Sequence, residues 1–170
     1  MSFFIVSFFI KKLIKYSFIF LITINLLLSK ALAEPTTNEA NFSVTNENKT
    51  ATGVTFNPTG TKMYVVGIKT GSVLSSIAQY NLSEPFNVGS SVTLDHDIVI
   101  NSLENRAQGI KFNANGTKVL VLGTHGDGVD VWDLTTPYDV STLTLANTSF
   151  TPIDDNPRGF DFNNDGTKMF

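Results

Sequence analysis

The stretch Phe56-Asn57-Pro58-Thr59-Gly60-Thr61-Lys62-Met63-Tyr64 decides the fold, because the chain repeats it twice. It returns as Phe112-Asn113-Ala114-Asn115-Gly116-Thr117-Lys118-Val119-Leu120 and as Phe162-Asn163-Asn164-Asp165-Gly166-Thr167-Lys168-Met169-Phe170. The repeated glycines are 56 and 50 residues apart. A recurrence in this range indicates an array of similar supersecondary units.

Each copy places a polar turn between two short apolar strands. Asn in the first turn position and Gly in the fourth are typical of a type I turn followed by a left-handed residue, which closes a hairpin with a G1 bulge. The glycines allow a positive φ, and the Asn side chains can bond back to the turn backbone. The predicted structural turn residues are Asn57, Gly60, Asn113, Gly116, Asn163 and Gly166.

Four strands are predicted in each complete repeat. The first reads Gly-apolar-x-Phe, which favours one buried face, and the second is a continuous apolar run, which favours burial on both faces. In the first repeat the remaining strands are expected at 76–82 and within 91–100, and in the second at 129–134 and within 142–150. The sequence therefore predicts repeats at 53–101 and 109–153 and the start of a third at 159–170.

Four antiparallel strands per unit at this period fit a blade of a β-propeller. The run Phe-Asn-x-x-Gly-Thr-Lys-Met-Tyr-Val, followed later by Val129-Asp130-Val131-Trp132-Asp133-Leu134, resembles the blades of YVTN and lactonase-like seven-bladed propellers and, more distantly, WD40 blades. The resemblance covers residues 42–170 and implies an all-β fold. It leaves function open, because such propellers include enzymes, ligand-binding proteins and interaction platforms.

About two and a third blades are expected in this chain, whereas a closed propeller has typically 4 to 8. The sequence is therefore interpreted as the N-terminal fragment of a longer protein with an incomplete ring. Residues 41–45 match the strand that precedes each hairpin, and they are predicted to complete a final blade and close the ring.

The N-terminus predicts an export signal at residues 1–33. Three lysines precede an apolar run from Tyr16 to Leu28, and Ala31-Leu32-Ala33 provides a peptidase site with cleavage before Glu34. An uncleaved anchor is the alternative, because the first ten residues add apolar length. Residues 34–40 are expected to be a flexible leader, and the protein is expected to be periplasmic, at the cell surface or secreted.

Charge and composition exclude several partners. Without the signal the chain has 8 basic and 15 acidic residues, a net charge of −7, which argues against nucleic acid and anionic membrane surfaces. Membrane contact is expected only through the signal if it is not cleaved. The chain has no cysteine, so thiol chemistry and Cys-based metal sites are excluded.

Thr52, Gln108 and Arg158 are the predicted binding residues. They occupy the same place in the three repeats, directly before the glycine of the first strand. In propellers of the kind that this chain resembles, the loop entering the innermost strand borders the central channel, where ligands usually bind. Three different polar residues at one repeated position would suit a site to which each blade contributes a distinct contact, and the alternative is ordinary loop residues.

Other polar clusters are weaker candidates. The segment 161–166 resembles the start of a calcium loop, but Lys111 occupies its first ligand position in the second repeat, so a turn is favoured. His125, Asp127 and Asp130 lie in or beside a glycine-rich segment that is expected to be solvated. His96 is expected on an outer strand, which leaves no two-histidine site within a blade. No metal site, cofactor or catalytic residue is predicted.

Three functions remain open. The first is an exported, non-catalytic propeller that binds an unknown ligand or protein at its channel face. The second is a propeller enzyme such as a lactonase-like hydrolase, with its catalytic residues on blades outside this sequence. The third is a structural surface array. Thr52, Gln108 and Arg158 do not titrate near neutral pH, so the first interpretation is preferred over acid–base catalysis on these blades.

Overall fold

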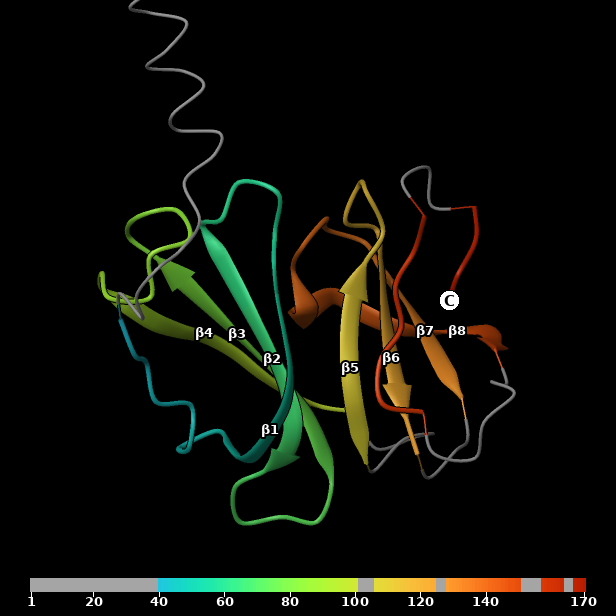
Figure 1. Cartoon of the computed structure of the whole chain (residues 1–170), viewed down its shortest axis with the longest axis horizontal. Helices are drawn as coiled ribbons and strands as arrows, with labels where there is room; N and C mark the ends of the chain where they lie inside the picture. Colours follow the sequence, from blue (N-terminus) through green and yellow to red (C-terminus); the bar gives the residue numbers. More distant parts are fainter. Residues whose placement is uncertain (1–39, 101–105, 125–127, 151–156, 164–166) are drawn as a thin grey trace, which may run out of the picture. The chain divides into compact units, whose positions relative to one another are not determined.

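The chain was analysed as a computed structural model, which describes residues 40–100, 106–124, 128–150, 157–163 and 167–170. In these residues the chain forms two antiparallel sheets of four strands (Figure 1). The first sheet contains β1 (Asn48–Phe56), β2 (Lys62–Lys69), β3 (Ser75–Leu82) and β4 (Val92–Val99). The second contains β5 (Ala107–Phe112), β6 (Lys118–Gly123), β7 (Val129–Leu134) and β8 (Leu143–Phe150), with a short 3₁₀ helix, η1 (Val140–Thr142), before β8.

The all-β fold class is confirmed, and each sheet pairs its strands in sequence order, as in a propeller blade. The described residues do not close a ring. The first strands are longer than predicted, since β1 starts at Asn48 and β5 at Ala107 rather than at the glycines. Each continues through a β-bulge, an irregularity that the apolar pattern does not reveal.

The described segments before β1 and after β8 add no strand to these sheets. Residues 41–44, part of the predicted ring-closing strand, have no regular structure here, and the chain turns at 45–47 before β1. In the third repeat, Phe162 and Met169 form an isolated antiparallel bridge. The predicted signal, residues 1–33, and all but the last residue of the leader lie outside the described residues.

One hydrogen bond recurs at the repeated turn in all three repeats. The Asn57 side-chain oxygen accepts from the amide of Lys62 at 2.9 Å, and the same bonds run from Lys118 to Asn113 at 2.9 Å and from Lys168 to Asn163 at 2.8 Å. Gly60 and Gly116 have φ of 69° and 72°, the left-handed values that this turn requires. Gly166 lies outside the described residues.

An aromatic ring covers each of the first two turn glycines. A Cβ atom on Gly60 would lie 2.3 Å from the ring of Phe86, and one on Gly116 would lie 2.3 Å from the ring of Tyr138. Both aromatic residues have positive φ, 58° and 59°, which is rare for bulky side chains and holds the rings over the turns. A side chain at either glycine would therefore clash with the ring, in addition to straining the backbone at a positive φ.

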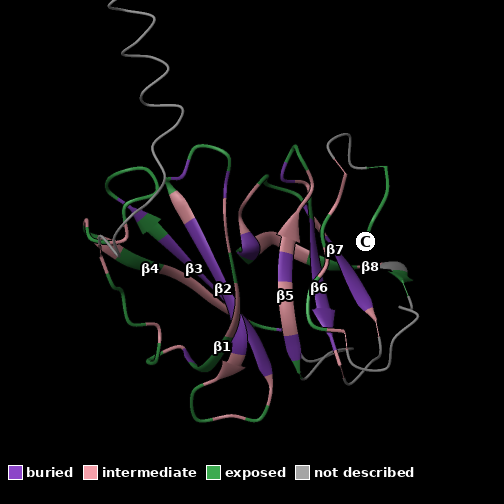
Figure 2. Cartoon of the chain, in the orientation of Figure 1, coloured by how far each residue is buried: buried purple, intermediate pink, exposed green. Residues whose placement is uncertain are grey.

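The main core fills the space between the two sheets. It joins the back face of the first sheet, which carries Tyr64 and Val66, to the front face of the second, which carries Ile110 and Val119. Figure 2 shows β2, β3, β6 and β7 as the most buried strands. Its members include Tyr64, Val66, Ile77, Ile100, Ile110, Val119, Val121, Trp132, Leu134 and Val140. The central strands are buried on both faces, which explains why their sequences are continuous apolar runs.

The front of the first sheet differs from the front of the second, although the residues correspond. Ile110 in β5 is 3% exposed because the first sheet covers it, whereas Val54 in β1 is 59% exposed. The prediction of a buried apolar face on the first strand is therefore correct for β5 and wrong for Val54, since no described sheet covers the front of β1.

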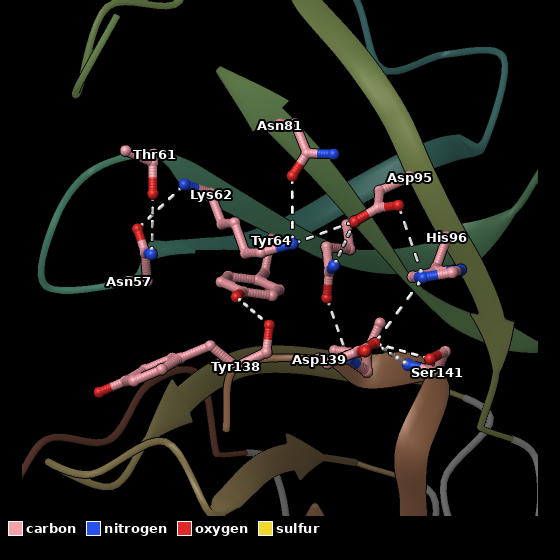
Figure 3. A network of polar contacts seen from close by, with 12 residues as sticks. Asn57, Thr61, Lys62, Tyr64, Asn81, Asp95, His96, Tyr138, Asp139 and Ser141 are labelled. Carbon is pink, nitrogen blue, oxygen red and sulfur yellow. Dashed lines mark hydrogen bonds and ion pairs between the residues drawn. The ribbon is translucent and has the colours of Figure 1, made fainter. Parts of the chain in front are cut away.

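Polar contacts across the core join the two sheets (Figure 3). The hydroxyl of Tyr64 donates to the carbonyl of Tyr138 at 2.6 Å. The buried amide of Gln79 accepts from the backbone N–H of Val140 at 2.9 Å and donates to the Asp95 carboxylate at 2.7 Å. These bonds satisfy buried polar groups that would otherwise destabilise the core.

Candidate functional site

Thr52 and Gln108 occupy matching β-bulges. The pairing of β1 with β2 shifts between Ala51 and Gly53, and the pairing of β5 with β6 shifts between Ala107 and Gly109. The residue skipped by each shift is therefore the predicted binding residue. A bulge redirects a side chain out of the regular alternation, and bulges are frequent beside functional sites.

The innermost strands of the two sheets lie side by side at these bulges. A Cβ atom on Gly53 would lie 3.0 Å from the Cα of Gly109 and 3.4 Å from the carbonyl oxygen of Gln108. The two backbones can approach this closely because neither glycine has a side chain. The first-strand glycine of the repeat is thus explained by strand packing, and Thr52 and Gln108 become neighbours across the sheets.

The third repeat also packs near β5. A Cβ atom on Gly109 would lie 3.5 Å from the ring of Phe160, which packs on the back of the second sheet. Phe160 follows Arg158 by two residues. The segment that carries Phe160 therefore lies close to β5 at Gly109. It forms no strand at residues 157–161, and Arg158 is related to Thr52 and Gln108 by its place in the repeat.

The side chains of Thr52, Gln108 and Arg158 differ in their exposure and in their hydrogen bonding. The hydroxyl of Thr52 contacts two carbonyl oxygens, that of Ala107 at 2.6 Å and that of Val66 at 3.2 Å. Gln108 is half-buried, and its amide forms no hydrogen bond with another described residue. Arg158 is exposed. Gln108 and Arg158 are therefore available for a ligand, whereas Thr52 is engaged with the backbone.

Ala107 is held from two sides at the start of the second bulge. Its carbonyl accepts from Thr52 on β1, and its N–H donates to the hydroxyl of Ser75 at 3.0 Å. Ser75 is fully buried and Ala107 is 1% exposed. The sequence gives no signal for this arrangement, because the two hydroxyl residues lie 23 positions apart.

An apolar pocket lies on the front of the first sheet. Its volume is about 370 Å³, and Thr52 and Gly53 are among its lining residues. The other lining residues are Phe42, Val44, Ala51, Val54, Met63, Val65 and Val88. Since neither Gln108 nor Arg158 lines it, this pocket is not the site that the repeated position predicts.

Charged groups near the sheet interface are paired. Burial alone would raise the pKa of Asp95, but hydrogen bonds from Lys62 at 3.0 Å and from Gln79 hold it below its usual range. His96 on β4 lies 3.5 Å from the carboxylate of Asp95 and 3.7 Å from that of Asp139 in the second sheet's connection (Figure 3). This cluster joins the sheets.

The weaker candidates do not form a second site. The Asp161 carboxylate accepts from the amide of Phe162 at 2.9 Å and lies 3.2 Å from the ammonium of Lys111, and both contacts lower its pKa. The remainder of the calcium-like segment and residues 125–127 lie outside the described residues. Asp130 lies on β7 and is 7% exposed.

Two searches of the described residues were negative. They contain no group of three or more His, Cys, Asp or Glu side chains that could hold a metal ion. They also contain no helix that is long and apolar enough to cross a membrane.

Comparison with known proteins gives a structural match only. No protein-family model matches the sequence, and no curated protein matches it. A solved structure of a proposed 6-phosphogluconolactonase from Bacteroides uniformis ATCC 8492 is similar, with a TM-score of 0.50 at 17% identity, over 70% of this chain and 34% of that chain. A second, from Bacteroides fragilis NCTC 9343, has a TM-score of 0.49 at 14% identity, over 70% of this chain and 31% of that chain.

The chain spans about a third of the length of these solved structures. At this level of identity the likeness concerns the fold. It agrees with the two antiparallel four-stranded sheets of this chain.

Proposed function

We propose that this chain forms two blades and the start of a third in a lactonase-like β-propeller hydrolase, and that Gln108 and Arg158 bind the substrate at its channel face. The observation that carries the proposal is the pair of matching bulges at Thr52 and Gln108 on the neighbouring strands β1 and β5. Arg158 holds the same place in the third repeat, and these three positions are called the row. The fold likeness to a proposed 6-phosphogluconolactonase supports the choice of a lactone as substrate.

The chemistry of the row suits a phosphorylated sugar lactone. A guanidinium binds a phosphate through two parallel hydrogen bonds, and Arg158 is exposed and charged at neutral pH. The Gln108 amide can both donate to and accept from sugar hydroxyls. We assign these residues to binding, because neither can act as an acid or base near neutral pH.

The reaction itself is the hydrolysis of an ester. Water attacks the lactone carbonyl, the ring acyl–oxygen bond breaks, and the open acid releases one proton at neutral pH. The groups that activate the water are proposed to lie on other blades of the same ring. Residues 41–45 are proposed to close that ring.

The test measures acid release from 6-phosphogluconolactone by the full-length protein, corrected for spontaneous hydrolysis. We expect enzymatic turnover in the wild type and, in Gln108→Ala, a KM raised about tenfold with kcat little changed, as for the loss of uniform binding. Lys49→Ala is a control, because its ammonium bonds the carbonyl of Ser72 away from the row. Absence of turnover in the wild type would contradict the hydrolase.

A second candidate is binding without catalysis. The observation that favours it is that Thr52, Gln108 and Arg158 include no carboxylate or imidazole that could act as a general acid or base. A calorimetric titration that shows lactone or sugar-acid binding, with no acid release from the lactone, would support this candidate over the hydrolase.

We also propose that the protein is exported, with cleavage before Glu34. The support is the order of lysines, apolar run and Ala31-Leu32-Ala33. N-terminal sequencing of the protein from its native cells tests this, and a mature chain that starts at Met1 would contradict cleavage.

A further inference from the structure

We infer that Thr52 is a positioning residue: together with Ser75 it clamps Ala107, and this clamp sets the direction of the Gln108 side chain. The inference rests on the proposed function only for the consequence in binding. The clamp itself is a property of the fold and can be tested without any substrate.

The hydroxyl of Thr52 makes a short contact with the second sheet. Its hydroxyl has one proton and two nearby carbonyls, and the distance to Ala107, 2.6 Å, is shorter than the 3.2 Å to Val66. The bond to Ala107 is thus the stronger one, and it crosses from the first sheet to the second. The Thr52 hydroxyl thus forms its stronger hydrogen bond with β5.

Ser75 completes the clamp from β3. It is fully buried, and its hydroxyl accepts from the N–H of Ala107 at 3.0 Å. Both backbone groups of Ala107 are therefore held by side chains of the first sheet. The ordinary partners of a residue at a strand end would lie in its own sheet.

Peptide planarity carries this constraint to Gln108. The carbonyl of Ala107 and the N–H of Gln108 belong to the same planar trans peptide, so fixing the oxygen fixes the plane in which Gln108 begins. Gln108 is the bulged residue, with no regular ladder position to orient it. The hydroxyl of Thr52 thus supplies a constraint that the ladder lacks at this residue, and it limits the directions in which the Gln108 side chain can leave the backbone.

The proposal separates two roles at one repeated position. Thr52, short and β-branched, bonds the next strand, whereas Gln108, longer and without a bond to another described residue, extends from the bulge. Thr52 is therefore expected to act on a ligand through Gln108 rather than by contact.

Nuclear magnetic resonance offers a substrate-free test, because the side-chain amides of Gln79 and Gln108 can each be assigned and followed separately. In the full-length protein, Thr52→Val removes the hydroxyl and keeps the shape, so the side-chain amide resonances of Gln108 should move. Those of Gln79, bonded at both ends, should stay in place as an internal reference. Thr52→Ser should restore the wild-type position of Gln108.

The matched control is Thr50→Val on the same strand, at an exposed position. If Gln108 does not respond to Thr52→Val, or responds equally to Thr50→Val, the inference is overturned. Ser75→Ala should move the Gln108 resonances in a second, independent way. Should Thr52→Val fail to fold, the wild type still decides: the Thr52 hydroxyl proton must be a slowly exchanging resonance, and its absence overturns the bond.

Kinetics then tests the consequence for binding. Thr52→Val is expected to raise KM for 6-phosphogluconolactone about fivefold with kcat little changed, and Thr52→Ser to restore it. A wild type without turnover would end the hydrolase proposal and leave the resonance test intact. A Gln108 shift with unchanged KM would overturn the link between the clamp and the ligand.

Discussion

The hydroxyl of Tyr64 donates to the carbonyl of Tyr138 across the two sheets at a distance of 2.6 Å. Tyr64 is fully buried in the core between the sheets, and its ring lies 4.4 Å from that of Phe112. This bond therefore links the buried centre of the first sheet to the connection before η1 in the second.

Tyr64→Phe should destabilise the protein by about 1–3 kcal/mol, because it leaves the Tyr138 carbonyl without its donor. Tyr80→Phe is the comparison, since Tyr80 is also buried but bonds Glu47, which directly precedes β1 of its own sheet, at 2.8 Å. Urea unfolding of both variants measures the difference. The account expects the Tyr64 variant to loosen the inter-sheet contact, and equal amide exchange across η1 in both variants would contradict it.

Alkaline pH should destabilise the fold. Burial raises the pKa of Tyr64, and burial with the Glu47 hydrogen bond raises that of Tyr80. The unfolded state therefore loses these protons first, at the ordinary value near 10, while the native state keeps them. The free energy of unfolding should fall as pH rises above about 10. Tyr64→Phe should reduce this slope, and an unchanged slope would exclude Tyr64 as its source.

Acid should weaken the cluster around Asp95. The hydrogen bonds from Lys62 and Gln79 lower the pKa of Asp95, so its contribution is present above the unfolded value near 3.8 and is lost as pH falls below it. The Asp95 side chain is partly exposed, at 27% of its accessible surface, so solvent screening should keep the effect below about 1 kcal/mol. Asp95→Asn should flatten the acid limb of the stability profile, and an unaltered limb in that variant would contradict the assignment.

Gly60→Ala should destabilise the protein more than Gly71→Ala. Both glycines have positive φ, 69° and 74°, so both variants share the conformational penalty of about 1–2 kcal/mol. Only the first variant meets a ring, that of Phe86, while a Cβ atom on Gly71 has open space around it. Thermal unfolding of the pair separates the two effects. Equal losses of stability in the two variants would contradict this, because they would show that the Phe86 ring moves aside without a cost in free energy.

The repeated stretch was sufficient to predict the all-β class and the order of four strands in each sheet. Asn57 and Gly60 carry local information, since a turn is decided by its own few residues. The apolar runs of β2 and β6 carry burial on both faces. These features depend on neighbours in sequence, and a pattern can report them.

The features that remained hidden depend on contacts between distant residues. The rings of Phe86 and Tyr138 over the turns, the bond from Thr52 to Ala107 and the exposure of Val54 all arise from how strands and sheets meet. The sequence located Thr52, Gln108 and Arg158 by their repeated place but could not show that Thr52 is already engaged. That distinction needed the distances between the sheets.

The most direct test of the proposed function is the preference of the full-length protein for a phosphorylated lactone. The measurement is kcat/KM for 6-phosphogluconolactone and for gluconolactone, in the wild type and in Arg158→Ala. The account predicts that the wild type prefers the phosphorylated substrate and that Arg158→Ala loses about tenfold or more of this preference, because a charge-assisted contact to phosphate is removed. An unchanged ratio in Arg158→Ala would contradict the assignment of this row as the substrate site.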